Sequence, residues 1–351
     1  MEKRRDPLWM ENDDVVMLDQ RRLPHTESFV RCPTYRETIR AIVDMTVRGA
    51  GSIGIAGAYA VAQALHEFVS INDDFLSACR EIRMSRPTAV NLTAGVTYVT
   101  SRLIAESDKN RAVEPIYARR LAVEFAESEK LATEQIGLAG ARLLDDKNLS
   151  IMTHCNAGWL AYPGYGTALA PIYYRLKNKY GRCNVFATET RPRSQGAKLT
   201  VWELQQAGVP VTLIADTAAG YMMSKDRVDA VIVGADRITV NGDTINKIGT
   251  YALAVLAQDN GIPFYVAAPT TTFDGLTRTG DEVEIEERSP SEVSTVTDGV
   301  LGFCIAPLGT KIENPAFDVT RESLVTAFIT ERGVFAPGQL PKLYEQMRRV
   351  C

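Results

Sequence analysis

Short apolar segments alternate with helix-length segments after residue 148, and this alternation constrains the possible folds more than any other feature. The short segments read as strands and lie at 149–153, 184–188, 211–214, 230–234, 263–268 and 302–305. Helical segments lie between them, as at 166–178, 196–207 and 247–258. Such a pattern is typical of βαβ units and predicts a parallel sheet. The segment AVIVG at 230–234 is apolar throughout, which suits a sheet covered on both faces.

The part of the chain before residue 148 has a helical pattern. Apolar residues recur three or four positions apart at 34–47, 50–68, 75–84 and 115–144, and residues 15–18 read as a short extended segment. The length of 351 residues suits two domains. We therefore predict an α/β protein with a mainly helical N-terminal domain at 1–145, beginning with a small extended segment. A Rossmann-like parallel-sheet domain is predicted at 146–351.

Charge and cysteine usage exclude several classes of protein. Thirty-nine Lys and Arg against 43 Asp and Glu give a net charge of −4, which argues against a nucleic-acid surface. The longest uncharged stretch, 148–174, contains three glycines and two prolines and is a poor membrane helix. Six dispersed cysteines and three histidines predict neither a disulfide scaffold nor a metal site. With no apolar export segment near the start, the expected compartment is the cytoplasm.

The segment GAGSIG at 49–54 matches the dinucleotide-binding pattern, but its context does not. That pattern requires a preceding strand, whereas 34–47 predicts a helix. Two interpretations remain open. Backbone N–H groups at the start of a helix, with Arg48 beside them, can hold a phosphate. Alternatively, the small residues allow two helices to pack closely.

Two polar residues follow predicted strands at the edge where parallel sheets bind ligands. Cys155 follows the strand at 149–153, and Asp236 follows the strand at 230–234. A thiol and a carboxyl group in one crevice can both transfer protons, and burial favours their protonated forms. The alternatives are a buried packing cysteine and an aspartate that caps a helix or pairs with Arg237. His154 is expected to point to the opposite face from Cys155, as neighbours in an extended chain do.

Further candidates for anion binding follow other predicted elements. The segment ETRPRSQG at 189–196 combines arginines, an amide and a helix start, with a solvated turn as the alternative. Asn246 and Lys247 are predicted to open a helix, where Lys247 either neutralises a phosphate or is solvated. Arg86 is either another phosphate contact or an ordinary exposed arginine.

Eight segments, taken in order, resemble the S-methyl-5-thioribose-1-phosphate isomerase family. They are RGA at 48–50, RPTAVNL at 86–92, THCNAG at 153–158, ETRP at 189–192, QG at 195–196, GADR at 234–237, NKIGT at 246–250 and NPAFDVT at 314–320. The resemblance spans roughly residues 15 to 330. Its superfamily also includes ribose-1,5-bisphosphate isomerase and regulatory subunits of the nucleotide-exchange factor of translation initiation.

The resemblance implies an aldose–ketose isomerase of methionine salvage, usually a homodimer, that acts on a small sugar phosphate without a metal or organic cofactor. It implies that Cys155 and Asp236 are the catalytic pair. The substrate contacts that it implies are Arg48, Gly49, Ala50, Arg86, Gln195, Asn246 and Lys247. Because phosphate occupies the anomeric oxygen of such a substrate, the ring must open by protonation of the ring oxygen, which suits a protonated Asp236. Cys155 is then expected to serve the transfer of hydrogen from C2 to C1, by proton or hydride movement.

Some positions depart from the family pattern. Gly51 and Ser52 stand where the family commonly has Pro-Ala, Trp159 and Tyr162 where it has small residues, and Ser194 where it often has Leu. Aromatic residues near Cys155 are expected to reshape the pocket for the 5-substituent. An isomerase of another 5-substituted pentose 1-phosphate, such as 5-deoxyribose 1-phosphate, is therefore one alternative. The other is a non-catalytic translation-factor subunit, against which the presence of Cys155 and Asp236 argues.

Overall fold

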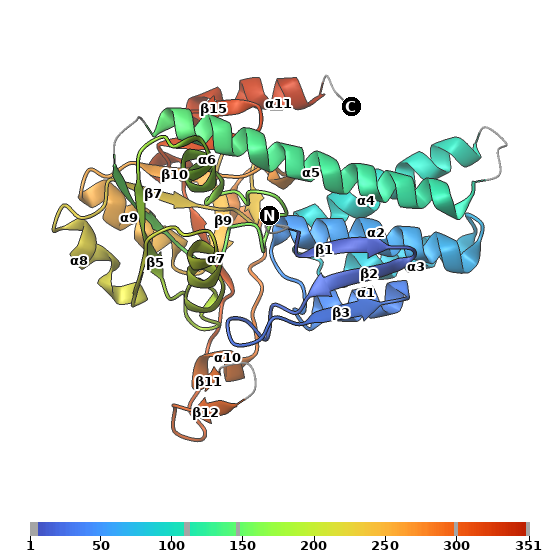
Figure 1. Ribbon diagram of the computed structural model, residues 1–351, viewed down its shortest axis with the longest axis horizontal. Helices are drawn as coiled ribbons and strands as arrows, with labels where there is room; N and C mark the ends of the chain where they lie inside the picture. The colour runs from blue at the N-terminus through green and yellow to red at the C-terminus, as the bar shows by residue number, and fades with distance from the viewer. Residues whose placement is uncertain (1–5, 109–112, 145–147, 298–300, 349–351) are drawn as a thin grey trace.

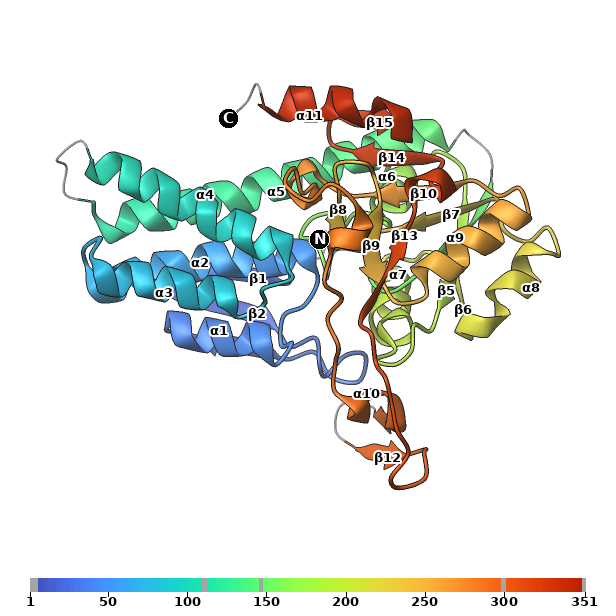
Figure 2. The ribbon, with the colours of Figure 1, turned by 180° about the vertical axis from the view of Figure 1, so that it is seen from behind.

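The computed structural model describes residues 6–108, 113–144, 148–297 and 301–348 (Figures 1 and 2). The predicted boundary between 145 and 146, and Cys351, lie outside these residues. In the described part of the chain, no helix combines the length and the apolar character that crossing a membrane requires.

The first part of the chain is a small antiparallel sheet followed by helices. The sheet has the order β1-β2-β3, with strands β1 (Leu8–Glu11), β2 (Asp14–Leu18) and β3 (Phe29–Cys32). The helices are α1 (Tyr35–Val43), α2 (Ala50–Phe68), α3 (Asp73–Met84), α4 (Val90–Ser107) and α5 (Pro115–Leu143). The prediction for 50–68 is confirmed residue for residue.

Two helix predictions need correction. Helix α1 begins at a Thr34 capping box but ends at Val43 rather than 47, because Met45 adopts a left-handed backbone (φ 63°). Helix α4 was not predicted. It has no side-chain cap at Ala89, and it is rich in valine and threonine, which have low helix propensity.

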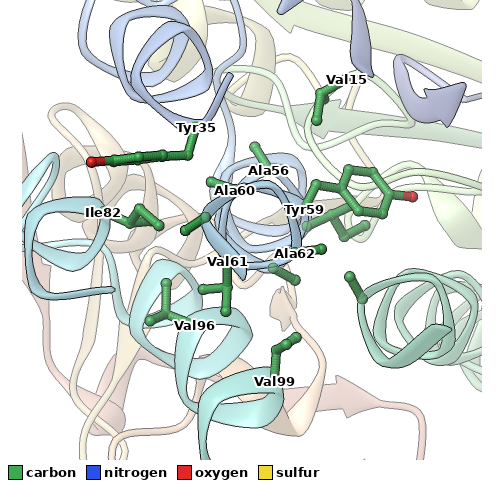
Figure 3. Close-up of a cluster of buried hydrophobic side chains, with 14 of the residues drawn as sticks. Val15, Tyr35, Ala56, Tyr59, Ala60, Val61, Ala62, Ile82, Val96 and Val99 are labelled. Carbon is green, nitrogen blue, oxygen red and sulfur yellow. The ribbon is translucent and has the colours of Figure 1, made fainter. Parts of the chain in front are cut away.

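Helix α2 is the centre of the N-terminal core. Every residue from Gly51 to Leu65 is buried. Side chains from neighbouring helices and from β2 surround it, among them Tyr35, Ile82 and Val96 (Figure 3). Helices α2 and α4 approach so closely that a Cβ on Gly54 would lie 2.7 Å from the carbonyl oxygen of Asn91. The small residues of the GAGSIG segment therefore do serve close helix packing at this point.

The second part of the chain is built on a seven-stranded sheet with the order β15-β14-β10-β7-β4-β5-β6. Six strands are parallel: β4 (Leu149–Thr153), β5 (Cys183–Thr188), β6 (Val211–Ile214), β7 (Ala230–Val233), β10 (Phe264–Ala267) and β14 (Ala327–Thr330). Strand β15 (Gly333–Phe335) is antiparallel to β14. Numbered by appearance, the parallel strands run 3-2-1-4-5-6, the Rossmann order, so the strand order reverses between β4 and β7.

Both faces of this sheet are covered, as the apolar strands predicted. Ile151 and Ile232 belong to a core with α6 (Ala170–Asn178), α7 (Val201–Gln206) and the C-terminal half of α5. Met152 and Val231 belong to a core with α8 (Ala219–Met223), α9 (Thr250–Asp259) and α11 (Leu340–Arg348). Helix α5 runs along both parts of the molecule (Figure 1).

The strand predicted at 302–305 is present as β12 (Gly302–Cys304), but its predicted place in the parallel sheet is wrong. Among the described residues β12 pairs with β11 (Thr295–Thr297) alone, and together with α10 (Pro290–Ser294) they form an arm that projects from the body (Figures 1 and 2). Phe303 is 71% exposed there. The apolar pattern of β12 resembles that of a core strand. The place beside β10 in the parallel sheet is taken instead by β14, which was not predicted.

A second correction concerns the helices that follow the strands. The helix predicted from 166 begins at Ala170, and the one predicted from 247 begins at Thr250. Residues before Thr250 instead form β9 (Thr244–Lys247) in a small antiparallel sheet with β8 (Arg237–Ile238) and β13 (Phe317–Thr320). Gly249, with φ 103°, separates β9 from α9.

Candidate active site

A cavity of about 50 Å³ lies at the carboxyl ends of β4 and β7, where the strand order reverses. The N-terminal helical part of the molecule forms its opposite wall, through the start of α2 and the residues just before α4. The residues that line it are Met45, Arg48, Gly49, Ala50, Ile53, Arg86, Thr88, Ala89, Cys155, Gln195, Asp236, Lys247, Arg288 and Phe317. All the predicted site residues except Asn246 are therefore brought to one place.

Cys155 is held by its backbone in a strained conformation. Its φ is 61°, so it does not extend β4, which ends at Thr153. Its N–H donates to Thr190 Oγ1 (2.8 Å), and its carbonyl oxygen accepts from Thr200 Oγ1 (2.6 Å). Thr190 is itself left-handed, with φ 62°. Each such residue costs about 1–3 kcal/mol, and surrounding contacts must hold it.

His154 is engaged away from Cys155. Its Nδ1 lies 2.6 Å from Thr188 Oγ1, and its Nε2 lies 2.8 Å from the carbonyl oxygen of Ile248. Burial lowers the pKa of the imidazole, so the neutral ring donates from Nε2 to the carbonyl and accepts from Thr188 at Nδ1. Both ring nitrogens therefore have partners other than the thiol.

Asp236 lies in the same cavity with part of its surface accessible from it. Its backbone N–H donates to the carbonyl oxygen of Ile245 (2.9 Å). Burial raises the pKa of the carboxyl group, and the nearby cations, Lys247 foremost, only partly oppose this. The alternative pairing with Arg237 does not occur, because Arg237 pairs with Asp274 (3.3 Å) and donates to the carbonyl oxygen of Thr88.

Arg48 is oriented by the motif that carries Cys155. Its Nη1 donates to Asn156 Oδ1 (3.0 Å), and Asn156 Nδ2 donates to the buried Glu203 on α7 (2.9 Å). A Cβ on Gly158 would lie 1.6 Å from Glu203 Oε1, so only glycine leaves room for that carboxyl group. Sequence reasoning did not find the positioning roles of Asn156 and Glu203, because their contact spans 47 positions of the chain and that of Asn156 with Arg48 spans 108.

Lys247 is buried at the end of β9, and not at the helix start that was predicted, so the solvated alternative is excluded. It is 5% exposed, its Nζ donates to the carbonyl oxygen of Ala316 (2.6 Å), and it lies 4.6 Å from the centre of the Phe317 ring. Burial foremost, and then the positive charge of Arg288, lower the pKa of the ammonium group to about 8. Asn246 is also buried but donates to Thr250 Oγ1 (2.9 Å) and does not line the cavity.

Arg86 and Arg288 both line the cavity, and both contact the carboxylate of Glu286. The side chain of Arg86 is only 14% exposed, so it is not an ordinary surface arginine, and its Nη2 lies 3.8 Å from Glu286 Oε2. Arg288 Nε donates to the same carboxylate (2.8 Å). Arg288 was not predicted, since it lies between elements in a charge-rich segment that matches no motif.

The start of α2 faces the cavity between these cations. Gly49 has φ 91°, and a Cβ there would lie 2.4 Å from Ala161 Cα, so only glycine fits. The 19-residue helix directs the positive end of its dipole at the cavity. With Arg48, Arg86, Lys247 and Arg288, this end forms a site suited to a phosphate group.

Gln195 is an unsatisfied polar group in the cavity wall. It is 5% exposed, and its Oε1 has no hydrogen-bond partner among the described residues. It precedes a π-helical turn (Gly196–Thr200) that continues into α7, and a Cβ on Gly196 would lie 1.8 Å from the carbonyl oxygen of Thr188. A buried acceptor of this kind is suited to a sugar hydroxyl. Among the described residues, no cluster of His, Cys, Asp and Glu is arranged to hold a metal.

The unusual aromatic residues do not line this cavity, contrary to expectation. Trp159 is buried in the sheet core against Trp202, with ring centres 5.6 Å apart. Tyr162 packs behind the start of α2, where its hydroxyl accepts from Asn91 Nδ2. A Cβ on Gly51 would lie 2.1 Å from the Tyr162 ring. Gly51 and Tyr162, which both depart from the family pattern, are thus in contact with each other.

Replacing Gly51 with alanine is expected to destabilise the protein by about 1–3 kcal/mol, because the Tyr162 ring is buried and hydrogen-bonded and has no space to retreat. Urea unfolding would measure this. Gly338→Ala is the control, since no described atom lies within 4 Å of its added Cβ. Equal stability of both variants would show that the contact relaxes freely.

Comparison with known proteins gives a consistent set of relatives. Residues 46–337 match the model of the Initiation factor 2 subunit family. Methylthioribose-1-phosphate isomerase of Chloroflexus aurantiacus is 47% identical over 346 residues, covering 96% of each chain. The crystal structure of 5-methylthioribose 1-phosphate isomerase from Pyrococcus horikoshii matches with a TM-score of 0.85 and 38% identity, over 97% of this chain and 96% of that one. Subunit delta of translation initiation factor eIF-2B from A. fulgidus matches at 0.78 and 37%, over 95% and 96%.

Proposed function

Because the chain belongs to the Initiation factor 2 subunit family and is similar to methylthioribose-1-phosphate isomerases over almost its full length, we propose that it has this activity. It converts S-methyl-5-thioribose 1-phosphate to S-methyl-5-thioribulose 1-phosphate in methionine salvage. The observation that carries the proposal is that Cys155 and Asp236 face one cavity with four cationic side chains, at the reversal point of the sheet.

The substrate phosphate binds between the start of α2 and the side chains of Arg86, Lys247 and Arg288. Charge-assisted hydrogen bonds from arginine and the dipole of the helix stabilise the phosphate there. Arg48, which Asn156 orients beside the start of α2, adds a further contact to the phosphate, and Gln195 contacts the sugar.

Ring opening requires an acid, because the phosphate blocks loss of the anomeric proton. Asp236 supplies the proton to the ring oxygen, and burial keeps its carboxyl group protonated more readily than in water. Cys155 then serves the transfer of hydrogen from C2 to C1, as a proton shuttle or as a stabiliser of the transition state. The proton given to the ring oxygen remains on the C4 hydroxyl, and the C2 hydroxyl proton returns to the Asp236 carboxylate as C2 becomes the ketone. Neither step draws on a metal or an organic cofactor.

Three further features complete the proposal. We propose that the protein is a homodimer, that it acts in the cytoplasm, and that each subunit consists of the two domains divided near residue 145. The two packed cores, one around α2 and one around the parallel sheet, support the last of these.

The catalytic efficiency kcat/KM is expected to fall as the pH rises through about 8, because Lys247 then loses the charge that attracts phosphate. Lys247→Arg keeps its charge and is expected to shift this fall to higher pH. A pH series of kcat/KM would measure it, with the exposed Lys342→Arg as control. An unchanged pH profile in Lys247→Arg would assign the fall to another group.

The decisive experiment is turnover of the purified protein on S-methyl-5-thioribose 1-phosphate and on 5-deoxyribose 1-phosphate. We expect a higher kcat/KM for the methylthio substrate. A tenfold preference for the 5-deoxy sugar, about 1.4 kcal/mol, would overturn the proposal in favour of the alternative isomerase. Binding to an initiation-factor complex without turnover of either sugar would favour the regulatory subunit.

A further inference from the structure

A second, larger cavity of about 430 Å³ adjoins the proposed catalytic cavity. The two share Met45, Arg48 and Gln195 in their walls. The outer wall of the second cavity comes from the arm, through residues such as Glu292 of α10 and Thr295 of β11. The phosphate-binding cations Arg86, Lys247 and Arg288 line only the inner cavity.

The three arginines that line only the outer cavity are held by partners at its wall. Arg21 pairs with Asp19 (2.8 Å), Arg193 pairs with Glu292 (2.7 Å), and Arg191 donates to the carbonyl oxygen of Val293 (2.9 Å). The apolar side chains in the same wall suit an uncharged group.

Apolar and short side chains form part of the wall of the outer cavity. Met45, Pro192 and Leu199 supply apolar surface, and Ser194 leaves space where a larger side chain would intrude. Met45 and Ser194 both have left-handed backbones, with φ 63° and 58°. Non-glycine residues held in this conformation cluster at ligand sites, where surrounding contacts maintain the strain.

We propose that the enzyme also isomerises pentose 1-phosphates whose 5-thioether carries an alkyl chain longer than methyl, and that this chain lies in the outer cavity. The inference rests on the proposed function. With the phosphate held by the cations that line only the inner cavity, the opposite end of the sugar, which carries the 5-substituent, lies toward the wall that the two cavities share. The inner cavity of about 50 Å³ is smaller than a pentose phosphate, so the substrate extends into the outer cavity, whose volume falls in the range of about 300–1,000 Å³ that accommodates small organic ligands.

The test compares kcat/KM for the 5-methylthio, 5-propylthio and 5-butylthio ribose 1-phosphates. Each methylene moved from water to an apolar wall favours binding by up to about fourfold. We therefore expect the longer substrates to equal or exceed the methylthio substrate. Ser194→Leu is expected to lower kcat/KM at least about tenfold for propyl and butyl chains and less than about threefold for methyl, since it narrows only the outer cavity.

Ser101→Leu, on the exposed face of α4, is the matched control and is expected to leave all three values unchanged. The inference is overturned if kcat/KM of the unmodified protein falls more than tenfold from methyl to propyl, or if Ser194→Leu affects all three substrates equally. Loss of the methylthio reaction itself would instead overturn the proposed function. If Ser194→Leu does not fold, the substrate series with the unmodified protein still decides the question.

Discussion

Asp236→Asn is expected to lower kcat about a thousandfold while leaving the fold intact. An amide has the size of the carboxyl group but has no acidic proton for the ring oxygen, and positioned general acids contribute about 10²–10⁴ in rate. Burial raises the pKa of Asp236, which favours the protonated carboxyl group in the native protein. The amide side chain of Asp236→Asn has no such proton to give. The change should appear in kcat more than in KM, since the phosphate contacts remain.

The matched control is Asp229→Asn. Asp229 stands just before β7, at the opposite edge of the sheet from Asp236, and accepts a hydrogen bond from the Ser150 N–H (2.7 Å), which an amide oxygen also accepts. Its variant should turn over substrate normally. Retention of more than a tenth of kcat in Asp236→Asn would show that another group protonates the ring oxygen.

Cys155→Ser is expected to lower kcat about 10²- to 10³-fold, because a hydroxyl group is a much weaker acid than a thiol. The backbone bonds to Thr190 and Thr200 do not involve the side chain, so the loop should keep its conformation. Steady-state turnover measures the loss, and Cys304→Ser, an exposed thiol in the arm, is the control.

Turnover by the unmodified protein in D₂O tests how hydrogen moves. If Cys155 shuttles a proton, product formed in D₂O carries deuterium at C1, and a hydride shift leaves C1 free of it. Near-normal turnover by Cys155→Ser would remove the thiol from the mechanism in either case.

Local patterns predicted much of the fold because some elements are specified by their own residues. Strands β4 and β6 and helix α2 begin and end where their apolar runs do. Helix α4 lacks a cap and is rich in β-branched residues, so only its packing against α2 makes it a helix. Strand β12 has a core-like pattern, yet it lies in the exposed arm.

The candidate site was found through residues that follow strands, a position with a direct physical meaning in a parallel sheet. Cys155 and Asp236 were identified in this way, whereas Arg288 was not, because its position depends on a long irregular segment. The prediction for Lys247 named the right residue in the wrong element, since Lys247 itself pairs with Phe317, 70 positions later in the chain.

By itself, the sequence determined which segments are apolar, where strands end and which chemical groups follow them, because these depend on neighbours along the chain. Only the tertiary structure decided that Tyr162 packs behind α2 rather than beside the thiol, and that Asn156 orients Arg48. Those outcomes depend on which surfaces meet once the two cores have packed. Contacts between residues distant in sequence leave no local pattern from which they can be read.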